Sequence, residues 1–193
     1  MLKSNTHRTV GVALFGALAF VLMFFAFPII PAFPYLKVDF SDLPILLSYL
    51  LYGPVAGILS GLVRSVLHYI RTGGDMGYPI GDVASFLASI AYCYPVYLIM
   101  RRAKSKKGLI FAFFAGILSL TIVLSIANWF VITPLYIKLL GFELGNIRTY
   151  LLAGIIPFNI FKGIIISVVY MLVLPKLRPW LVRVNKINVM KKK

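Results

Sequence analysis

Four long runs of the chain contain no charged residue: 9–36, 43–63, 83–100 and 108–137. A helix needs roughly 20 apolar residues to cross the hydrocarbon core of a bilayer, so each run is about long enough to do so. The chain of 193 residues is 61% hydrophobic and 13% charged, which is more apolar surface than one soluble core can enclose. Hydrocarbon offers no partner to backbone amides, and the runs lack the alternation of barrel strands. The sequence therefore predicts an all-α integral membrane protein, with several passes through the cell membrane.

The charged residues separate by sign. The acidic residues occupy three short stretches, which hold Asp39 and Asp42, then Asp75 and Asp82, then Glu143. Basic residues gather at the start of the chain, in 101–107 and in 176–193. Because Lys and Arg are enriched in cytoplasmic loops, all three basic segments should face the cytoplasm and contact lipid headgroups.

This charge pattern also fixes the number of crossings. Clear spans are 10–30, 82–100, 108–132 and 150–175, while 43–71 is long enough for one helix or two. Two crossings place the amino terminus and the 101–107 loop on the same side, and Tyr52-Gly53-Pro54 provides a turn between them. We therefore expect six transmembrane helices with both termini cytoplasmic, as one domain over 1–175 followed by a basic cytoplasmic tail over 176–193.

The second of these helices is too short to span a membrane alone. Residues 43–53 would extend about 16 Å, against a hydrocarbon core of about 30 Å. The preceding segment, 31–42, must therefore enter the protein from outside. Irregular backbone is tolerated at that depth only where protein or a cavity surrounds it, which points to a pocket open to the outer face.

Three polar residues lie within the predicted spans. Lys162 falls near the middle of the last span, Asn159 precedes it by about one turn, and Asn128 lies toward the outer end of the fifth. They could line one pocket walled by Trp129, Phe130 and Phe158. Such a mixture suits an aromatic, hydrogen-bonding small molecule. The alternative is a structural set of interhelical hydrogen bonds with a lysine that reaches the membrane surface.

Other polar and small residues have structural interpretations. Arg64, His68 and Arg71 form a stripe on the third helix, and we expect the arginines to pair with acids of the outer loops. His68 is too isolated to be a metal ligand or proton relay. Ala13 with Ala17, and Gly57 with Gly61, have the spacing of close helix contacts.

Several functions are excluded by what the sequence lacks. The single cysteine, Cys93, rules out an intrachain disulfide. No phosphate-binding loop, zinc-protease motif or serine-hydrolase motif is present, so the chain should neither hydrolyse ATP nor bind a catalytic metal. The basic residues lie at membrane edges without an aromatic-basic groove, which argues against nucleic acid. No acid is expected at membrane depth to carry protons.

Five strings of residues, taken in order, resemble the riboflavin-specific S components of energy-coupling factor transporters. They are 35–44, 52–54, 78–81, 128–130 with 134–136, and 157–163. The resemblance covers about residues 8–175. It implies a non-enzymatic subunit without a catalytic cofactor, which captures riboflavin from outside. It also implies docking on a coupling transmembrane subunit with two ATPases, followed by toppling that delivers the vitamin inward.

The resemblance further implies roles for particular residues. Asn128, Asn159 and Lys162 would hydrogen-bond the flavin, Tyr35, Leu36 and Tyr78 would close over it, and Glu143 would accept from a ribityl hydroxyl. The residues assigned to the ligand are Tyr35, Leu36, Lys37, Asp39, Tyr78, Asn128, Trp129, Glu143, Phe158, Asn159 and Lys162. Ala13 and Ala17 are assigned to the coupling subunit.

Three alternatives remain open from the sequence. Another vitamin such as folate, thiamine, pantothenate or biotin could be the ligand of the same kind of subunit. An integral membrane enzyme acting on lipid headgroups is disfavoured, because every acid falls on the outer side. A purely structural membrane protein would leave Lys162 and the inward-dipping segment unexplained.

Overall fold

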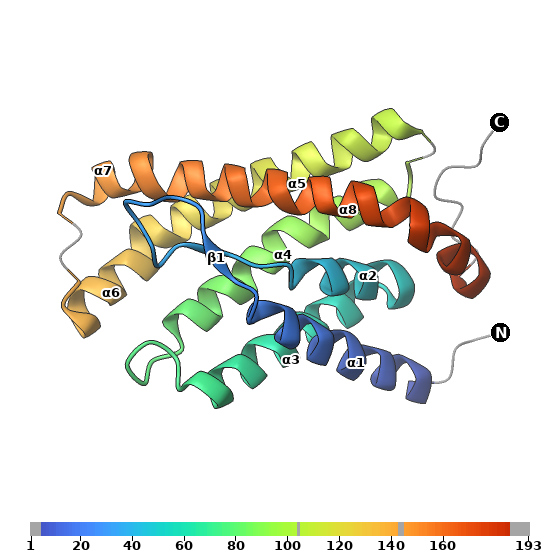
Figure 1. Cartoon of the computed structure of the whole chain (residues 1–193), viewed down its shortest axis with the longest axis horizontal. Helices are drawn as coiled ribbons and strands as arrows, with labels where there is room; N and C mark the ends of the chain where they lie inside the picture. The colour runs from blue at the N-terminus through green and yellow to red at the C-terminus, as the bar shows by residue number, and fades with distance from the viewer. Residues whose placement is uncertain (1–4, 104, 143–144, 186–193) are drawn as a thin grey trace.

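The computed structural model describes residues 5–103, 105–142 and 145–185, which form an elongated helical bundle (Figure 1). The first four helices are α1 (Asn5–Met23), α2 (Asp42–Tyr52), α3 (Pro54–Thr72) and α4 (Ile80–Met100). Two longer composite helices follow them. The prediction of an all-helical protein is confirmed.

Each composite helix contains a π-helical segment. The first joins α5 (Lys106–Ala127), η1 (Asn128–Ile132) and α6 (Thr133–Leu140), and the second joins α7 (Ile147–Tyr150), η2 (Leu151–Ile155) and α8 (Ile156–Asn185). Each π segment ends two residues before a proline, Pro134 or Pro157. Proline lacks an N–H and its ring crowds the preceding turn, so a wider turn relieves a clash that a regular α-helix would suffer.

Both composite helices are longer than the sequence predicted. The fifth predicted span ended at 132, whereas the helix continues to Leu140. The last predicted span ended at 175, whereas α8 continues to Asn185, past Pro175 and Pro179. The start of the predicted tail at 176 is thus helical and continuous with the bundle.

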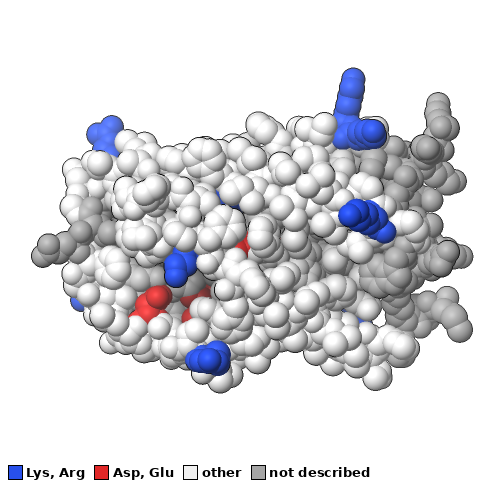
Figure 2. All heavy atoms as spheres, in the orientation of Figure 1, with Lys and Arg blue, Asp and Glu red and all other residues white. Residues whose placement is uncertain are grey.

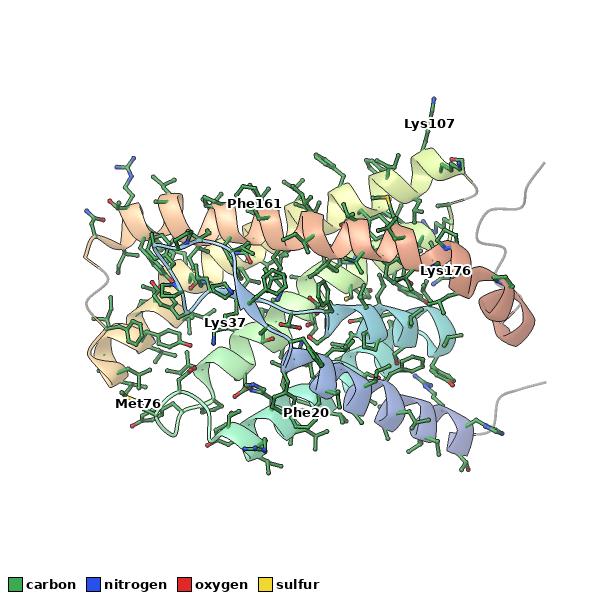
Figure 3. The ribbon with its side chains drawn as sticks, in the orientation of Figure 1. Phe20, Lys37, Met76, Lys107, Phe161 and Lys176 are labelled. Carbon is green, nitrogen blue, oxygen red and sulfur yellow. The ribbon has the colours of Figure 1, made fainter. Side chains whose placement is uncertain are left out.

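The two ends of the bundle differ in charge. At the right of Figure 1 lie the start of α1, the end of α8, the end of α4 and the start of α5, and at the left lie the loops 24–41 and 73–79 and the end of α6. Acidic atoms are seen in the left half of Figure 2. Lys107 and Lys176 lie at the right of Figure 3, while Met76 lies at the left. The structure therefore places the end of α4 and the start of α5, which flank the basic loop, far from the acidic 73–79 loop.

Four helical stretches are long and apolar enough to cross a membrane by length and composition: Thr6–Met23, Ile80–Met100, Lys106–Leu140 and Ile147–Leu177. The helix α2 is apolar but shorter. The helix α3 has enough residues but carries Arg64, His68 and Arg71. These two helices are the pair that the sequence placed within 43–71.

The loop before α2 enters the protein, as predicted. The strand β1 (Phe27–Pro28) pairs antiparallel with β2 (Lys37–Val38), a short ribbon that the sequence did not predict. Val38 and Ser41 are fully buried. At the other end of α2, Gly53 has φ 90°, and Pro54 begins α3, so the predicted turn is confirmed. Glycine adopts this positive φ without steric cost.

The helix α2 lies in the interior, where it contacts α1, α3, α4 and α8. Most of its residues are buried, which explains why it is apolar on all sides. The Ser48 and Ser60 hydroxyls are 2.8 Å apart, and Ser60 donates to the Val12 carbonyl at 3.2 Å. These bonds join α2, α3 and α1. Gly57 allows the Tyr49 ring of α2 to lie directly against the α3 backbone.

Two glycines of α3 offer a matched test of this packing. A methyl group at Gly57 would overlap the Tyr49 ring, whereas at Gly61 it would meet Phe86 at 3.5 Å, an ordinary contact. Gly57→Ala should destabilise the protein, because overpacking costs about 1–3 kcal/mol. Gly61→Ala should be neutral or stabilising, because alanine exceeds glycine in helix propensity by about 1 kcal/mol. Thermal unfolding in detergent checks both, and equal melting temperatures would contradict the packing described.

Candidate functional site

Four charged side chains meet inside the bundle. Asp39 is 5% exposed, Asp42 1%, Arg64 0% and Lys162 4%. They come from the end of loop 24–41, the start of α2, the middle of α3 and α8. Two carboxylates and two cations make the group formally neutral, which reduces the cost of burying it. The sequence suggested no acid at the depth of Lys162, whereas the structure places Asp42, the first residue of α2, beside it.

Asp42 lies between the two cations. Its Oδ1 accepts a hydrogen bond from the Ser89 hydroxyl and lies 3.7 Å from Arg64 Nη1. Its Oδ2 lies 3.8 Å from Lys162 Nζ. Asp42 is also in the first turn of α2, where the helix dipole favours a negative charge. Lys162 is therefore held by an acid 120 positions earlier in the chain, a pairing that sequence spacing does not indicate.

Arg64 connects loop 24–41 to α3 and α4. Its Nη1 donates to the hydroxyls of Ser41 at 2.8 Å and Ser89 at 2.9 Å, and its Nη2 donates to Ser65 at 3.1 Å. The planar guanidinium carries several N–H donors in fixed directions, so it can bond three hydroxyl acceptors at once. The expectation that Arg64 pairs with an acid is confirmed, with Asp42 as the partner. Arg71 is exposed and has no ion pair within the described residues.

Asp39 shapes the last turn of the loop. Its Oδ1 accepts a hydrogen bond from the Ser41 backbone N–H at 2.8 Å. The positive charges of Lys162 and Arg64 act on this carboxylate and offset the cost of burying it. Asp39 thus completes the neutral group as a carboxylate.

The two asparagines are buried beside the π segments. Asn128 donates to the Leu124 carbonyl at 2.8 Å and accepts from Thr133 Oγ1 at 3.3 Å. Asn159 donates to the Ile155 carbonyl at 2.9 Å. The segments η1 and η2 contact each other, as do α5 and α8, so both amides lie on adjoining helices. Each amide has two N–H donors and uses one of them on a residue that the structure describes, which leaves the other N–H for a further partner.

Aromatic side chains pack where loop 24–41 meets the composite helices. The Tyr35 ring lies 5.6 Å from Phe142 and 6.3 Å from Tyr150, and its hydroxyl is hydrogen-bonded to that of Tyr150. The Phe33 ring lies 5.4 Å from Tyr150. Leu36 packs against the small cluster of Tyr150, Leu151 and Ile155. Loop 24–41 therefore lies over α7 and η2, as the resemblance implied for a covering loop.

The remaining predicted residues are more dispersed. Phe158 is buried, but Trp129 is 41% exposed and Phe130 is 71% exposed, so Phe130 provides no buried wall. Tyr78 is exposed, and its backbone pairs with that of Asp75 through two hydrogen bonds. Lys37 is exposed on β2 (Figure 3). Glu143 lies outside the described residues.

The polar contacts of two acids at this end of the bundle, Asp82 and Asp75, are not indicated by the sequence. His68 Nδ1 lies 2.6 Å from Asp82 Oδ1, so His68 is not isolated. The Tyr136 hydroxyl donates to Asp75 Oδ2 at 2.7 Å, and the Gly81 N–H donates to the same atom at 2.8 Å. These contacts join α6 to the loop between α3 and α4. Tyr136 follows Asp75 by 61 positions, so no local pattern signals the bond.

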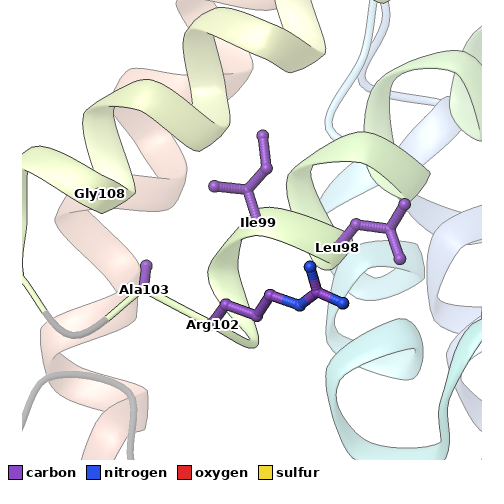
Figure 4. Close-up of a pocket in the computed structure, with 5 residues that line it drawn as sticks. All are labelled: Leu98, Ile99, Arg102, Ala103 and Gly108. Atoms are coloured by element: carbon purple, nitrogen blue, oxygen red, sulfur yellow. The ribbon is translucent and has the colours of Figure 1, made fainter.

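A hollow of about 360 Å³ lies at the opposite, basic end of the bundle (Figure 4). It is lined by Leu98, Ile99, Arg102, Ala103 and Gly108, from the end of α4 and the start of α5. None of these residues belongs to the buried charges or the aromatic cover. The hollow is thus separate from the candidate site.

A family model described as "ECF transporter, substrate-specific component" matches residues 7–174. The chain belongs to this family of S components. The prediction drawn from the resemblance is confirmed at the level of the family, and the protein is a multi-pass component of the cell membrane.

Individual relatives match nearly the whole chain. The chain is 40% identical over 181 residues to the riboflavin transporter FmnP of Bacillus subtilis (strain 168), and the match covers 92% of this chain and 95% of that protein. It is 41% identical over 182 residues to the riboflavin transporter RibU of Staphylococcus aureus (strain TCH60), covering 93% and 95%. A solved structure described as "Structure and mechanism of the S component of a bacterial ECF transporter" matches with a TM-score of 0.78 and 41% identity, covering 92% of this chain and 99% of that chain.

The buried charges should be needed for folding of this S component. Arg64→Met leaves Asp39 and Asp42 with Lys162 alone and removes three hydrogen bonds to serines. Breaking a buried pair of this kind costs about 3–5 kcal/mol, so we expect a large fall in the melting temperature in detergent. Arg71→Met, on the same helix but exposed, should melt within a few degrees of the parent protein. Equal effects of the two substitutions would show that the buried network does not stabilise the bundle.

Proposed function

We propose that this chain is the riboflavin-binding subunit of an ECF-type importer, which captures the vitamin from outside and delivers it inward. The observation that carries the proposal is the buried Lys162. Its charge is balanced by Asp42, whose Oδ2 lies 3.8 Å from the Lys162 ammonium, farther than a hydrogen bond reaches. The names of relatives that are 40% and 41% identical over nearly the whole chain support riboflavin as the ligand that uses these donors.

The chemistry of riboflavin suits this group of residues. The isoalloxazine ring is flat and aromatic, with carbonyl oxygens and ring nitrogens along its polar edge, and the ribityl chain carries hydroxyls. A lysine ammonium donates only, while an asparagine amide both donates and accepts. Lys162, Asn159 and Asn128 can therefore meet the polar edge or the ribityl chain. Their burial strengthens each bond, because water does not compete.

The other predicted residues have supporting roles in this proposal. Phe158 packs against the ring, and Tyr35, Leu36 and Tyr78 cover it from the loops. Trp129 lies at the edge of the site, and Asp39 and Lys37 belong to the covering loop. Glu143 accepts from a ribityl hydroxyl.

We further propose six crossings with both termini cytoplasmic. The crossings are α1, α2 with its entry loop, α3, α4 and the two composite helices. Two features support this arrangement: α2 and α3 form a tight pair at Gly53-Pro54, and the basic 101–107 loop lies at the end of the bundle away from the acidic loops. Residues 1–175 would act as one substrate-binding domain, with 176–193 as a basic cytoplasmic tail.

The importer would take its energy from partners. A coupling transmembrane subunit would bind the S component and two ATPase subunits would drive it, since this chain has no phosphate-binding loop. Ala13 and Ala17 support a docking role, because both are exposed on one face of α1, while Gly11 and Gly16 pack inward on Tyr52 and Val63. Small exposed residues allow another helix to approach closely.

Riboflavin binding is tested by titrating the purified protein in detergent and following the quenching of flavin fluorescence. We expect Asn159→Leu and Lys162→Met each to weaken binding by more than about tenfold, which corresponds to about 1.4 kcal/mol. Asp42 keeps Arg64 and Ser89 as partners, so the Lys162 variant should still fold. Lys176→Met, which is exposed near the other end of α8, is the matched control and should bind normally. If the parent protein did not bind riboflavin but bound another vitamin, the ligand assignment would be refuted.

Docking is tested separately by placing bulk on the exposed face of α1. Ala13→Trp and Ala17→Trp should abolish riboflavin uptake by cells, because a large ring prevents close helix approach. Neither substitution should change riboflavin affinity in detergent, since neither residue is near the buried charges. Ile110→Trp, on the exposed face of α5, should leave uptake intact. Normal uptake by both alanine variants would place the docking surface elsewhere.

A further inference from the structure

The two carboxylate oxygens of Asp42 are used differently. Oδ1 receives the Ser89 hydroxyl and faces Arg64. Oδ2 faces Lys162 and accepts no hydrogen bond from the described residues, although it is fully buried. The Asp42 carboxylate thus contacts α3 and α4 through Oδ1 and faces α8 with Oδ2.

The distance between Asp42 and Lys162 is informative. A charge-assisted hydrogen bond from an ammonium to a carboxylate measures about 2.7–2.9 Å. The separation of 3.8 Å is longer, so Asp42 attracts the ammonium without taking one of its hydrogens. All three N–H donors of Lys162 remain available within the described part of the chain. This arrangement balances the charge of Lys162 and preserves its capacity to donate to another molecule.

We propose that Asp42 is the positioning residue for Lys162. Asp42 holds the Lys162 ammonium so that its N–H donors are directed to a bound ligand, and Asp42 itself does not contact that ligand. The inference rests on the proposed function, because riboflavin is the acceptor that would take these hydrogen bonds. It adds a residue outside the predicted site, and one that acts only through Lys162.

The same carboxylate also links the ligand site to loop 24–41. Asp42 directly follows Ser41, whose hydroxyl accepts from Arg64 and whose N–H is held by Asp39. Arg64 in turn pairs with Asp42. The end of the covering loop and the position of Lys162 are therefore set by one connected group. The bonds of Ser41 to Arg64 and Asp39 do not involve the Asp42 side chain, so a substitution of Asp42 should leave the loop in place and act on the position of Lys162.

A double-mutant cycle tests the proposal with purified protein in detergent. Riboflavin affinity is measured for the parent, Asp42→Asn, Lys162→Met and the double variant. If Asp42 acts through Lys162, Asp42→Asn weakens binding by at least about tenfold, or about 1.4 kcal/mol, and the double variant binds no more weakly than Lys162→Met alone. Asp82→Asn is the matched control, since this buried acid pairs with His68, and its affinity should stay within about twofold of the parent.

Two further variants protect the test from a folding defect. Asp42→Glu keeps the negative charge and should bind more tightly than Asp42→Asn, which a requirement for side-chain shape alone would not produce. The double variant removes one charge of each sign and keeps the group neutral, so it should fold where Asp42→Asn does not.

The outcomes separate the two proposals. The positioning role would be overturned if Asp42→Asn bound riboflavin as tightly as the parent. It would also be overturned if the fold-losses in affinity of the two single variants multiplied in the double variant. Either result would leave the riboflavin assignment intact. Parent protein that does not bind riboflavin would overturn both.

Discussion

A neutral group of four buried charges connects one loop and several helices that are far apart in the sequence. Asp39 and Asp42 supply two negative charges, and Arg64 and Lys162 two positive ones. Single charges in a low-dielectric interior cost several kcal/mol each, and pairing with hydrogen bonds offsets that cost. Three serines provide the bonds to Arg64. Through this group the entry loop, α2, α3, α4 and α8 share one connection.

The group explains how a helix of 11 residues can stand at the centre of a membrane protein. The irregular backbone before α2 must be satisfied by protein, because lipid offers no partner. The Asp39 carboxylate accepts from the Ser41 backbone N–H, and Arg64 holds the same residue by donating to its hydroxyl. At the outer end, Phe33, Tyr35 and Tyr150 then hold the loop against the last composite helix. The charges fix the inner end of the loop, and the rings fix its outer part.

The sequence predicts what depends on neighbouring residues. Apolar runs identify the spans, Gly53-Pro54 identifies the turn, and the shortness of α2 identifies a buried entry loop, because each is a local property of length, hydropathy or φ. Pairings over long separations are not local, so Asp42 with Lys162 and Asp75 with Tyr136 were missed. The π segments were also missed, although Pro134 and Pro157 mark the strain that they relieve. The end of the last helix was misplaced because Pro175 suggests a stop, while the helix continues past it.

The account is tested most directly by an experimental structure of the protein with riboflavin bound. We expect Lys162 Nζ to lie about 3 Å from an oxygen or nitrogen acceptor of the vitamin. We expect it to remain within about 4 Å of Asp42, the limit for an ion pair. Riboflavin bound in the hollow beside Arg102, or a Lys162 amine turned away from both Asp42 and the vitamin, would contradict the account.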